Sequence, residues 1–447
     1  EISEKINEIS QNFIKQLKLS FIYKIISLIT SFVLVKYMLE YLGPLNYGIW
    51  VVILTFINWI IFFDFGIANG IKNKVSESLS KNNIKEAREY ISTGYVILLI
   101  FSVITYILFF ALSFFINWQS IFNVENISNT YLHKLMIITL FFILANFTLS
   151  IIIAIFNATQ NASLIVFQQL LSQFFALVLV CFLNNYTESS LLHISFAYGF
   201  SLLLSNVLMS YYFYIKNKNY IPSFSFYKKD KVKSIFSLGM KFFYLQLTIL
   251  IILSSDVMII TQLLGSSYVT KYDILFKYFG ILMIVHTIIN TPLWSMYTEA
   301  YNKGDYVWIE KTLIKMILLM FIYIILSVIM YFSGDKIIEL WLNNTKLDIT
   351  NSNYIYSIIM TLMLIWFSIF AYFTNGINKT NTQLLGASIG AIINIPLSIY
   401  FVKNIEMGID GVLLATTISL SIFGIMGPIQ AIREIKKMKL DNIKERK

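Results

Sequence analysis

Twelve long apolar stretches run through the chain from Leu17 to about Ala431, and short polar connections separate them. A helix rises 1.5 Å per residue, so about 20 residues cross the hydrocarbon core of a bilayer. Each stretch is near that length, and the chain is therefore expected to be an all-α protein that crosses a membrane many times. The expected spans are 17–40, 47–70, 88–115, 132–156, 162–184, 190–215, 235–262, 272–295, 310–332, 352–374, 382–402 and 408–431.

Composition excludes several classes of protein. Of 447 residues, 57% are hydrophobic and 13% are charged, about half the charged fraction of soluble proteins. The net charge of +10 comes from lysines in loops, not from a basic patch beside aromatic residues, so no nucleic-acid partner is expected. A single cysteine, Cys181, allows no intrachain disulfide. The three histidines are far apart, and we expect no metal site, no cofactor and no nucleophile motif.

Lysine and arginine favour one set of loops over the other by about four to one. The rich set includes the N-terminus, the connections after the second, sixth, eighth and tenth spans, and the C-terminal tail. The positive-inside rule therefore predicts that both termini and the connection at 216–234 are cytoplasmic. Residues 2–17 carry isoleucines at helical spacing. This pattern fits a helix on the cytoplasmic surface or an extension of the first span.

The two halves of the chain match at an offset of 222 residues. The matched positions are Leu42-Gly43 with Leu264-Gly265, Glu77 with Glu299, and Lys81 with Lys303. A further match, at a slightly shorter offset, relates 157–161 to 375–379. Each half holds six spans, an even number, so the repeat is parallel with a pseudo-two-fold axis along the membrane normal. We expect an N-terminal lobe at 1–215, a cytoplasmic linker at 216–234, a C-terminal lobe at 235–431 and a basic tail at 432–447.

Several segments resemble one family of membrane proteins. They are Tyr41-Leu42-Gly43-Pro44, Phe63-Asp64-Phe65-Gly66, Leu238-Gly239-Met240-Lys241 and, most specifically, Thr291-Pro292-Leu293-Trp294-Ser295. Together they resemble the Wzx-type oligosaccharide flippases, the polysaccharide transporter branch of the superfamily that includes the MATE drug exporters. The resemblance implies a MATE-like fold in the bacterial cytoplasmic (inner) membrane. It also implies movement of undecaprenyl-diphosphate-linked oligosaccharides to the outer leaflet for O-antigen or capsule synthesis. The two-lobed repeat predicts alternating access as the mechanism.

Two features depart from other branches of that superfamily. The chain has twelve expected spans, where the lipid II flippases typically have fourteen. Its embedded charges are mainly lysines, where MATE exporters rely on acidic residues.

Among the ionisable residues that fall within the expected spans are Lys24, Asp64, Lys241, Asp256, Lys277 and His286. An ionised group at mid-bilayer costs roughly 2.5–3.5 kcal/mol on insertion scales, so these groups must pair, reach the interface or line water. Matching depth predicts the pairs Lys24–Asp64 and Asp256–Lys277, either as static braces or as working groups. Lys241 is near enough to the end of its span to snorkel to the cytoplasm. A histidine on an apolar face, such as His286, is more often a packing residue.

The functional interpretation assigns Lys24, Lys241 and Lys277 to the substrate's diphosphate, because lysine binds phosphate as a point charge. Asp64, Asp256 and His286 are the candidates for coupling to H⁺ or Na⁺. Polar side chains that could contact sugars are Gln168, Gln169, Gln173, Asn378, Asn381 and Asn394. The expected partners are the lipid-linked oligosaccharide and membrane lipid, and the protein is expected to be a monomer.

Two other functions compete with this interpretation. A cation-coupled exporter of small amphipathic molecules would favour acidic or apolar walls, and the embedded lysines count against it. A membrane glycosyltransferase would need a large extramembrane loop with paired carboxylates, whereas the longest connection has about 20 residues. The chain is therefore not expected to be an enzyme.

Overall fold

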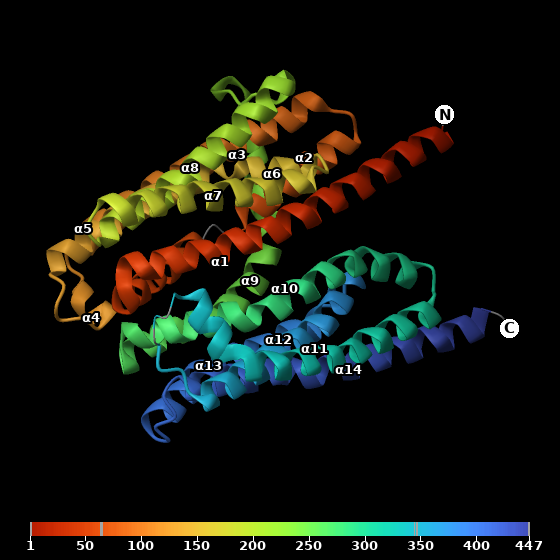
Figure 1. The fold of residues 1–447 in the computed structure, drawn as a ribbon. Coiled ribbons are helices and arrows are strands. Elements are labelled where there is room, and N and C mark those ends of the chain that lie inside the picture. Colours follow the sequence, from red (N-terminus) through yellow and green to blue (C-terminus); the bar gives the residue numbers. More distant parts are fainter. Residues whose placement is uncertain (1, 63–65, 344, 346, 446–447) are drawn as a thin grey trace. The chain divides into compact units, whose positions relative to one another are not determined.

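The computed structural model describes residues 2–62, 66–343, 345 and 347–445, and nearly all of these are helical (Figure 1). The chain forms two compact units, Glu1–Gln246 and Leu247–Lys447. The first unit holds α1 (Ile2–Phe62), α2 (Ile67–Ser80), α3 (Ile84–Ser113), α4 (Trp118–Phe122), α5 (Asn129–Leu149), α6 (Ile151–Ala158), α7 (Ala162–Tyr186), α8 (Leu191–Lys216), η1 (Lys218–Tyr220) and η2 (Phe224–Phe226). The division falls inside α9 (Lys229–Leu264). The second unit continues with α10 (Ser266–Asn302), α11 (Tyr306–Trp341), α12 (Asn351–Gly376), α13 (Asn381–Lys403) and α14 (Ile409–Glu445).

Ten segments in the described part of the chain are long and apolar enough to cross a membrane. The first, Lys18–Ile61, covers most of two predicted spans, 17–40 and 47–70. Nine others match one predicted span each. The remaining predicted span, 235–262, falls on α9, whose apolar part is the shorter segment Leu250–Leu264. The all-α membrane architecture predicted from hydropathy is confirmed.

A kink divides α1 between its two predicted spans. Gly43 adopts φ 71° and ψ 167°, a backbone conformation that is essentially restricted to glycine, and Pro44 follows it. Helix continues on both sides, so α1 runs from Ile2 through the kink to Phe62. Of the two possibilities for residues 2–17, the structure has the extension of the first span.

The predicted repeat is visible in individual turns. The turns after α2 and after α10 are closed by the same three backbone hydrogen bonds. The donor–acceptor pairs are Lys81–Glu77, Asn82–Leu79 and Asn83–Ser78 in the first turn, and Lys303–Glu299, Gly304–Tyr301 and Asp305–Ala300 in the second. Asn82 and Gly304 both have positive φ, at 54° and 69°. The turns at 77–83 and 299–305, which are 222 residues apart, therefore share their backbone geometry.

Side chains at these turns also repeat. Glu77 forms an ion pair with Lys81 at 2.7 Å, and Glu299 forms the equivalent ion pair with Lys303. Hydrogen bonds from Lys74 and Lys81 lower the pKa of Glu77 to about 2. The next helix is capped in both turns, because Asn83 accepts from the backbone of Glu86 just as Asp305 accepts from Trp308.

Close packing in the second unit depends on small residues of α13. A Cβ atom added at Gly386 would meet Phe423 of α14 at 2.9 Å, and one added at Gly390 would meet the carbonyl of Ser419 at 2.5 Å. Small residues at this spacing allow two membrane helices to approach closely. The same face of α13 carries Asn394 one turn further on, which brings that amide against Thr416 of α14.

Candidate functional site

In the first unit, polar side chains line the contact between α1 and α7, which lie side by side (Figure 1). We call this contact the α1–α7 seam. Its hydrogen-bonded pairs are Gln16–Ser163, Lys24–Gln169, Ser27–Gln173 and Tyr41–Thr187. The separation along the chain stays near 146 residues, so the two helices run parallel. From Gln16 to Tyr41 the seam spans about 37 Å, comparable to the thickness of a bilayer.

Lys24 is the cation of the seam. Its Nζ donates to Gln169 Oε1 at 3.5 Å, and one turn further along Ser27 Oγ donates to Gln173 Oε1 at 2.5 Å. Lys24 is half-buried and Gln169 is exposed. Within the described residues, no carboxylate lies within ion-pair distance of Lys24. The predicted partner Asp64 lies outside the described residues, so the Lys24–Asp64 pair stays a prediction.

The three glutamines of α7 separate into two roles. Gln169 and Gln173, one turn apart, both face α1. Gln168 is buried on another side of the helix, where its Nε2 donates to Ser205 Oγ of α8 at 3.1 Å. Consecutive helical residues differ in direction by about 100°, which is why the neighbours Gln168 and Gln169 do not share a face.

In the second unit, a buried polar cluster surrounds Asp256 of α9. We call the set Ser255, Asp256, Tyr272, Asn394 and Thr416 the Asp256 cluster. Tyr272 donates to the Asp256 carboxylate at 2.9 Å, and Thr416 donates to its two oxygens at 2.8 and 2.9 Å. Asn394 donates to Thr416 at 3.0 Å and accepts from Ser255 at 2.9 Å. Four helices therefore converge on one fully buried carboxyl group.

The predicted pair between Asp256 and Lys277 does not form, and that prediction was wrong. Lys277 pairs instead with Asp273, one turn away on its own helix. Matching depth in the membrane does not fix the rotation of a helix, and an i,i+4 pair needs no agreement between two helices. The side chains that contact Asp256 are Tyr272 and Thr416, which donate hydrogen bonds to its carboxylate, and not Lys277.

His286 is also buried, in a separate place on α10. Its Nε2 lies 3.2 Å from Asn290 Nδ2, and its ring packs edge-on against Tyr323. Its Nδ1 has no hydrogen-bond partner within the part of the chain that the structure describes. Its burial and its polar contact with Asn290 fit both a packing role and an ion-coupling role.

The remaining predicted residues do not gather at either site. Asn378 is exposed in the turn between α12 and α13, and Asn381 is exposed at the first position of α13. Both lie well before Asn394, which is further along α13. Lys241 lies within a described helix, but the structure does not describe the Lys241 side chain. No group of three or more His, Cys, Asp or Glu side chains suited to a metal occurs among the residues described.

Comparison with known proteins gives one matching family. The family described as "Polysaccharide biosynthesis protein" matches residues 13–298. A putative O-antigen transporter of Salmonella typhimurium is 23% identical over 90% of this chain and 92% of its own. A putative O-antigen export protein of Yersinia pseudotuberculosis is 21% identical over 87% of this chain and 89% of its own.

Solved structures give the fold. A multidrug resistance MATE family transporter of the MOP superfamily, in an inward-facing conformation, aligns with a TM-score of 0.76 over 95% of this chain and 99% of its own. The outward-facing conformation of such a transporter aligns with a TM-score of 0.64. The sequence identities of 13% and 14% support a shared MATE-like fold and nothing finer. The relatives and these structural neighbours are transporters, not enzymes.

Proposed function

The chain belongs to the polysaccharide biosynthesis protein family, and on that premise we propose that it is a flippase for lipid-linked oligosaccharides. Its substrate would be an undecaprenyl-diphosphate-linked unit of a surface polysaccharide such as O-antigen. The relatives named as a putative O-antigen transporter and a putative O-antigen export protein, similar over about nine-tenths of both chains, support this assignment. The protein would act in the bacterial cytoplasmic membrane with both termini in the cytoplasm.

The observation that carries the proposal is the position of Lys24 in the α1–α7 seam. Its ammonium group contacts a neutral amide oxygen, so its positive charge is not cancelled by that contact. A phosphate group could therefore gain the full attraction of this cation in surroundings of low dielectric constant. Lys241 and Lys277 are further proposed contacts to the diphosphate. Lys277 is expected to bind the diphosphate more weakly than Lys241, because Lys277 already pairs with Asp273.

Sugar contacts are proposed for Gln169 and Gln173. Both amides sit on the seam, one turn apart, and each is in hydrogen-bond contact with α1. An amide offers a donor and an acceptor, which suits the hydroxyl groups of a sugar. Gln168 and Asn394 are buried in helix packing, so they are better suited to supporting their helices than to touching substrate.

Coupling to H⁺ or Na⁺ is proposed for the Asp256 cluster. No basic side chain in the described structure lies within ion-pair distance of Asp256. Two hydroxyl groups and an amide next to them could share a proton or surround a small cation. A buried carboxylate without a counter-charge is costly, and uptake of either ion would remove that cost. Alternating access, in which this site is exposed in turn to the two sides, is part of the proposal.

The alternative is a cation-coupled exporter of small molecules, which the MATE-like fold also accommodates. Transport assays with the purified protein in liposomes separate the two functions. We expect an undecaprenyl-diphosphate-linked oligosaccharide to move between leaflets and amphipathic cationic dyes to remain in place. Transport of dyes without any movement of the lipid-linked sugar would reject the flippase.

A further inference from the structure

The connection between α8 and α9 is basic and partly apolar. Residues 216–229 contain four lysines, at 216, 218, 228 and 229, and no acidic residue. They follow directly on a candidate membrane span, Leu191–Lys216. A cluster of four or more basic residues next to a span is a common feature of sites that bind anionic lipids.

This connection, which we call the basic strap, is fixed against the start of α3. Arg88 donates from Nε to the carbonyl of Ile221 at 2.7 Å, and its guanidinium lies 4.0 Å from the centre of the Phe226 ring. Backbone N–H groups of the strap also donate to Ser92 and Thr93 of α3. The strap is therefore held in place at several points, yet Phe224 remains 80% exposed.

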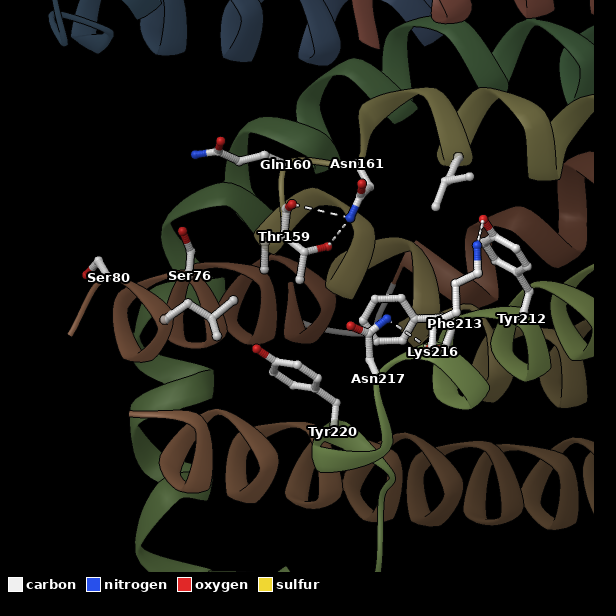
Figure 2. Close-up of a pocket in the computed structure, with 13 residues that line it drawn as sticks. Ser76, Ser80, Thr159, Gln160, Asn161, Tyr212, Phe213, Lys216, Asn217 and Tyr220 are labelled. Carbon is white, nitrogen blue, oxygen red and sulfur yellow. Dashed lines mark hydrogen bonds between the residues drawn. The ribbon is translucent and has the colours of Figure 1, made fainter. Parts of the chain in front are cut away.

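A pocket of about 570 Å³ opens at the beginning of the strap (Figure 2). It lies between the ends of α2, α6 and α8, and its polar lining residues are Ser76, Ser80, Thr159, Gln160, Asn161, Lys216, Asn217 and Tyr220. Figure 2 shows the Tyr220 hydroxyl directed toward the side of the pocket where Ser76 and Thr159 lie. The hydroxyl groups of Ser76 and Tyr220 have no hydrogen-bond partner among the described residues.

Lys216 supplies a positive charge at this pocket. Its Nζ donates to the Tyr212 hydroxyl at 2.8 Å, which leaves two of its three N–H donors for another acceptor. The face of α8 before it is apolar and exposed, at Leu208, Tyr211 and Ile215. A molecule with an anionic, hydroxyl-bearing head and a hydrocarbon tail would match the pocket, the charge and this face together.

We propose that the basic strap and its pocket bind an acidic phospholipid with a polyol headgroup, of the phosphatidylglycerol type. The phosphate lies at Lys216 and Lys218. The headgroup hydroxyls bond with Tyr220 and Ser76, and the acyl chains lie along α8. Phe224 inserts its exposed ring among neighbouring lipids. This site is distinct from the α1–α7 seam, and its occupant is a resident lipid rather than transported substrate.

Native mass spectrometry of the full-length protein tests the site. Protein in detergent is mixed with phosphatidylglycerol or with phosphatidylethanolamine of identical chains, and the retained lipid is counted. We expect the protein to retain phosphatidylglycerol preferentially. The double variant Lys216→Gln/Lys218→Gln should lower this preference at least about fivefold, the factor that one lysine near an anionic surface contributes. Tyr220→Phe, which removes only a hydroxyl, should lower it less.

The matched control is Lys311→Gln/Lys315→Gln, which removes two exposed lysines outside the strap. It should leave the lipid preference unchanged. Equal loss in the control and strap variants would overturn the site, because only the total charge would then matter. Displacement of the bound lipid by millimolar glycerol 1-phosphate would overturn the assignment to a membrane lipid and leave a site for a soluble phosphate. Equal retention of the two phospholipids by the unmodified protein would reject the proposal outright.

Discussion

The ammonium group of Lys24 lies 3.5 Å from the side-chain oxygen of Gln169, a residue 145 positions further along the chain. The neutral amide oxygen contacts this half-buried cation without neutralising it. The contact therefore orients Lys24 while its charge stays available to an anion, which is what a diphosphate-binding residue needs. A lysine held by a carboxylate would have a structural role instead.

Replacement of Lys24 tests this distinction. Lys24→Ala should reduce surface glycan at least about tenfold in a flippase-null strain, since loss of a charged hydrogen bond costs about 1.5–3 kcal/mol. Lys24→Arg should keep part of the activity, because the charge survives while its geometry changes. Immunoblots of the membrane fraction check that each variant is inserted. Normal glycan with Lys24→Ala would remove Lys24 from the binding site.

The rival role for Lys24 is a brace with Asp64, and a double change separates the two. If Lys24 only neutralises Asp64, then Lys24→Ala/Asp64→Asn should restore the glycan that Lys24→Ala loses. If Lys24 binds the diphosphate, the double variant should stay as inactive as the single one. The same complementation assay reports both outcomes, and rescue would assign Lys24 to structure.

Asp256→Asn should uncouple transport from ion gradients. The amide keeps the shape of the side chain but loses the charge that a proton or Na⁺ would neutralise. We expect flipping in proteoliposomes to lose its acceleration by an imposed pH or Na⁺ gradient. Tyr272→Phe, which removes one hydrogen bond to Asp256 and leaves the carboxylate in place, should weaken the gradient response without abolishing it. A gradient response of Asp256→Asn equal to that of the unmodified protein would exclude this residue from coupling.

Gly265 and Gly280 provide a matched pair of glycines for a test of stability. Gly265 has φ 100° and ψ 160° at the start of α10, whereas Gly280 is helical, and an added Cβ would meet nothing within 4 Å at either position. Gly265→Ala should therefore destabilise the protein by about 1–3 kcal/mol through backbone strain alone. Gly280→Ala should be neutral or stabilising by up to about 1 kcal/mol. Thermal unfolding in detergent measures both, and equal melting temperatures would contradict the assigned strain.

The matching turns of the two halves were predictable from the sequence because their signals are local. A glycine at positive φ and a Glu–Lys pair four residues apart act within one turn, so Gly43 with Gly265 and Glu77 with Glu299 kept their roles in both halves. Hydropathy likewise predicted the spans, because membrane thickness sets helix length directly. Lys24 and Gln169 could each be predicted as site residues, because a polar side chain within an apolar helix is also a local signal.

Contacts between helices were not predictable in this way, since they depend on helix rotation. Lys24 and Gln169 had been given separate roles, and nothing in the sequence indicated that they touch. The pairing of Asp256 with Lys277 failed for the same reason, although Asp273 stands four residues before Lys277 and was the available local signal. Thr416 was missed because a threonine in an apolar helix usually bonds to its own backbone.

The orientation of the protein in the membrane rests on loop charge, and cysteine labelling tests it. In a Cys181→Ala background, Asp230→Cys places a thiol at an exposed position on the lysine-rich connection, and Glu125→Cys places one at an exposed position between α4 and α5. Since lysines accumulate on the cytoplasmic side, a membrane-impermeant maleimide added to intact cells should label Cys at 125 and spare Cys at 230. In inside-out vesicles the pattern should reverse. Labelling of position 230 from outside would invert the topology, and Lys24 would then lie near the wrong leaflet to receive a substrate made in the cytoplasm.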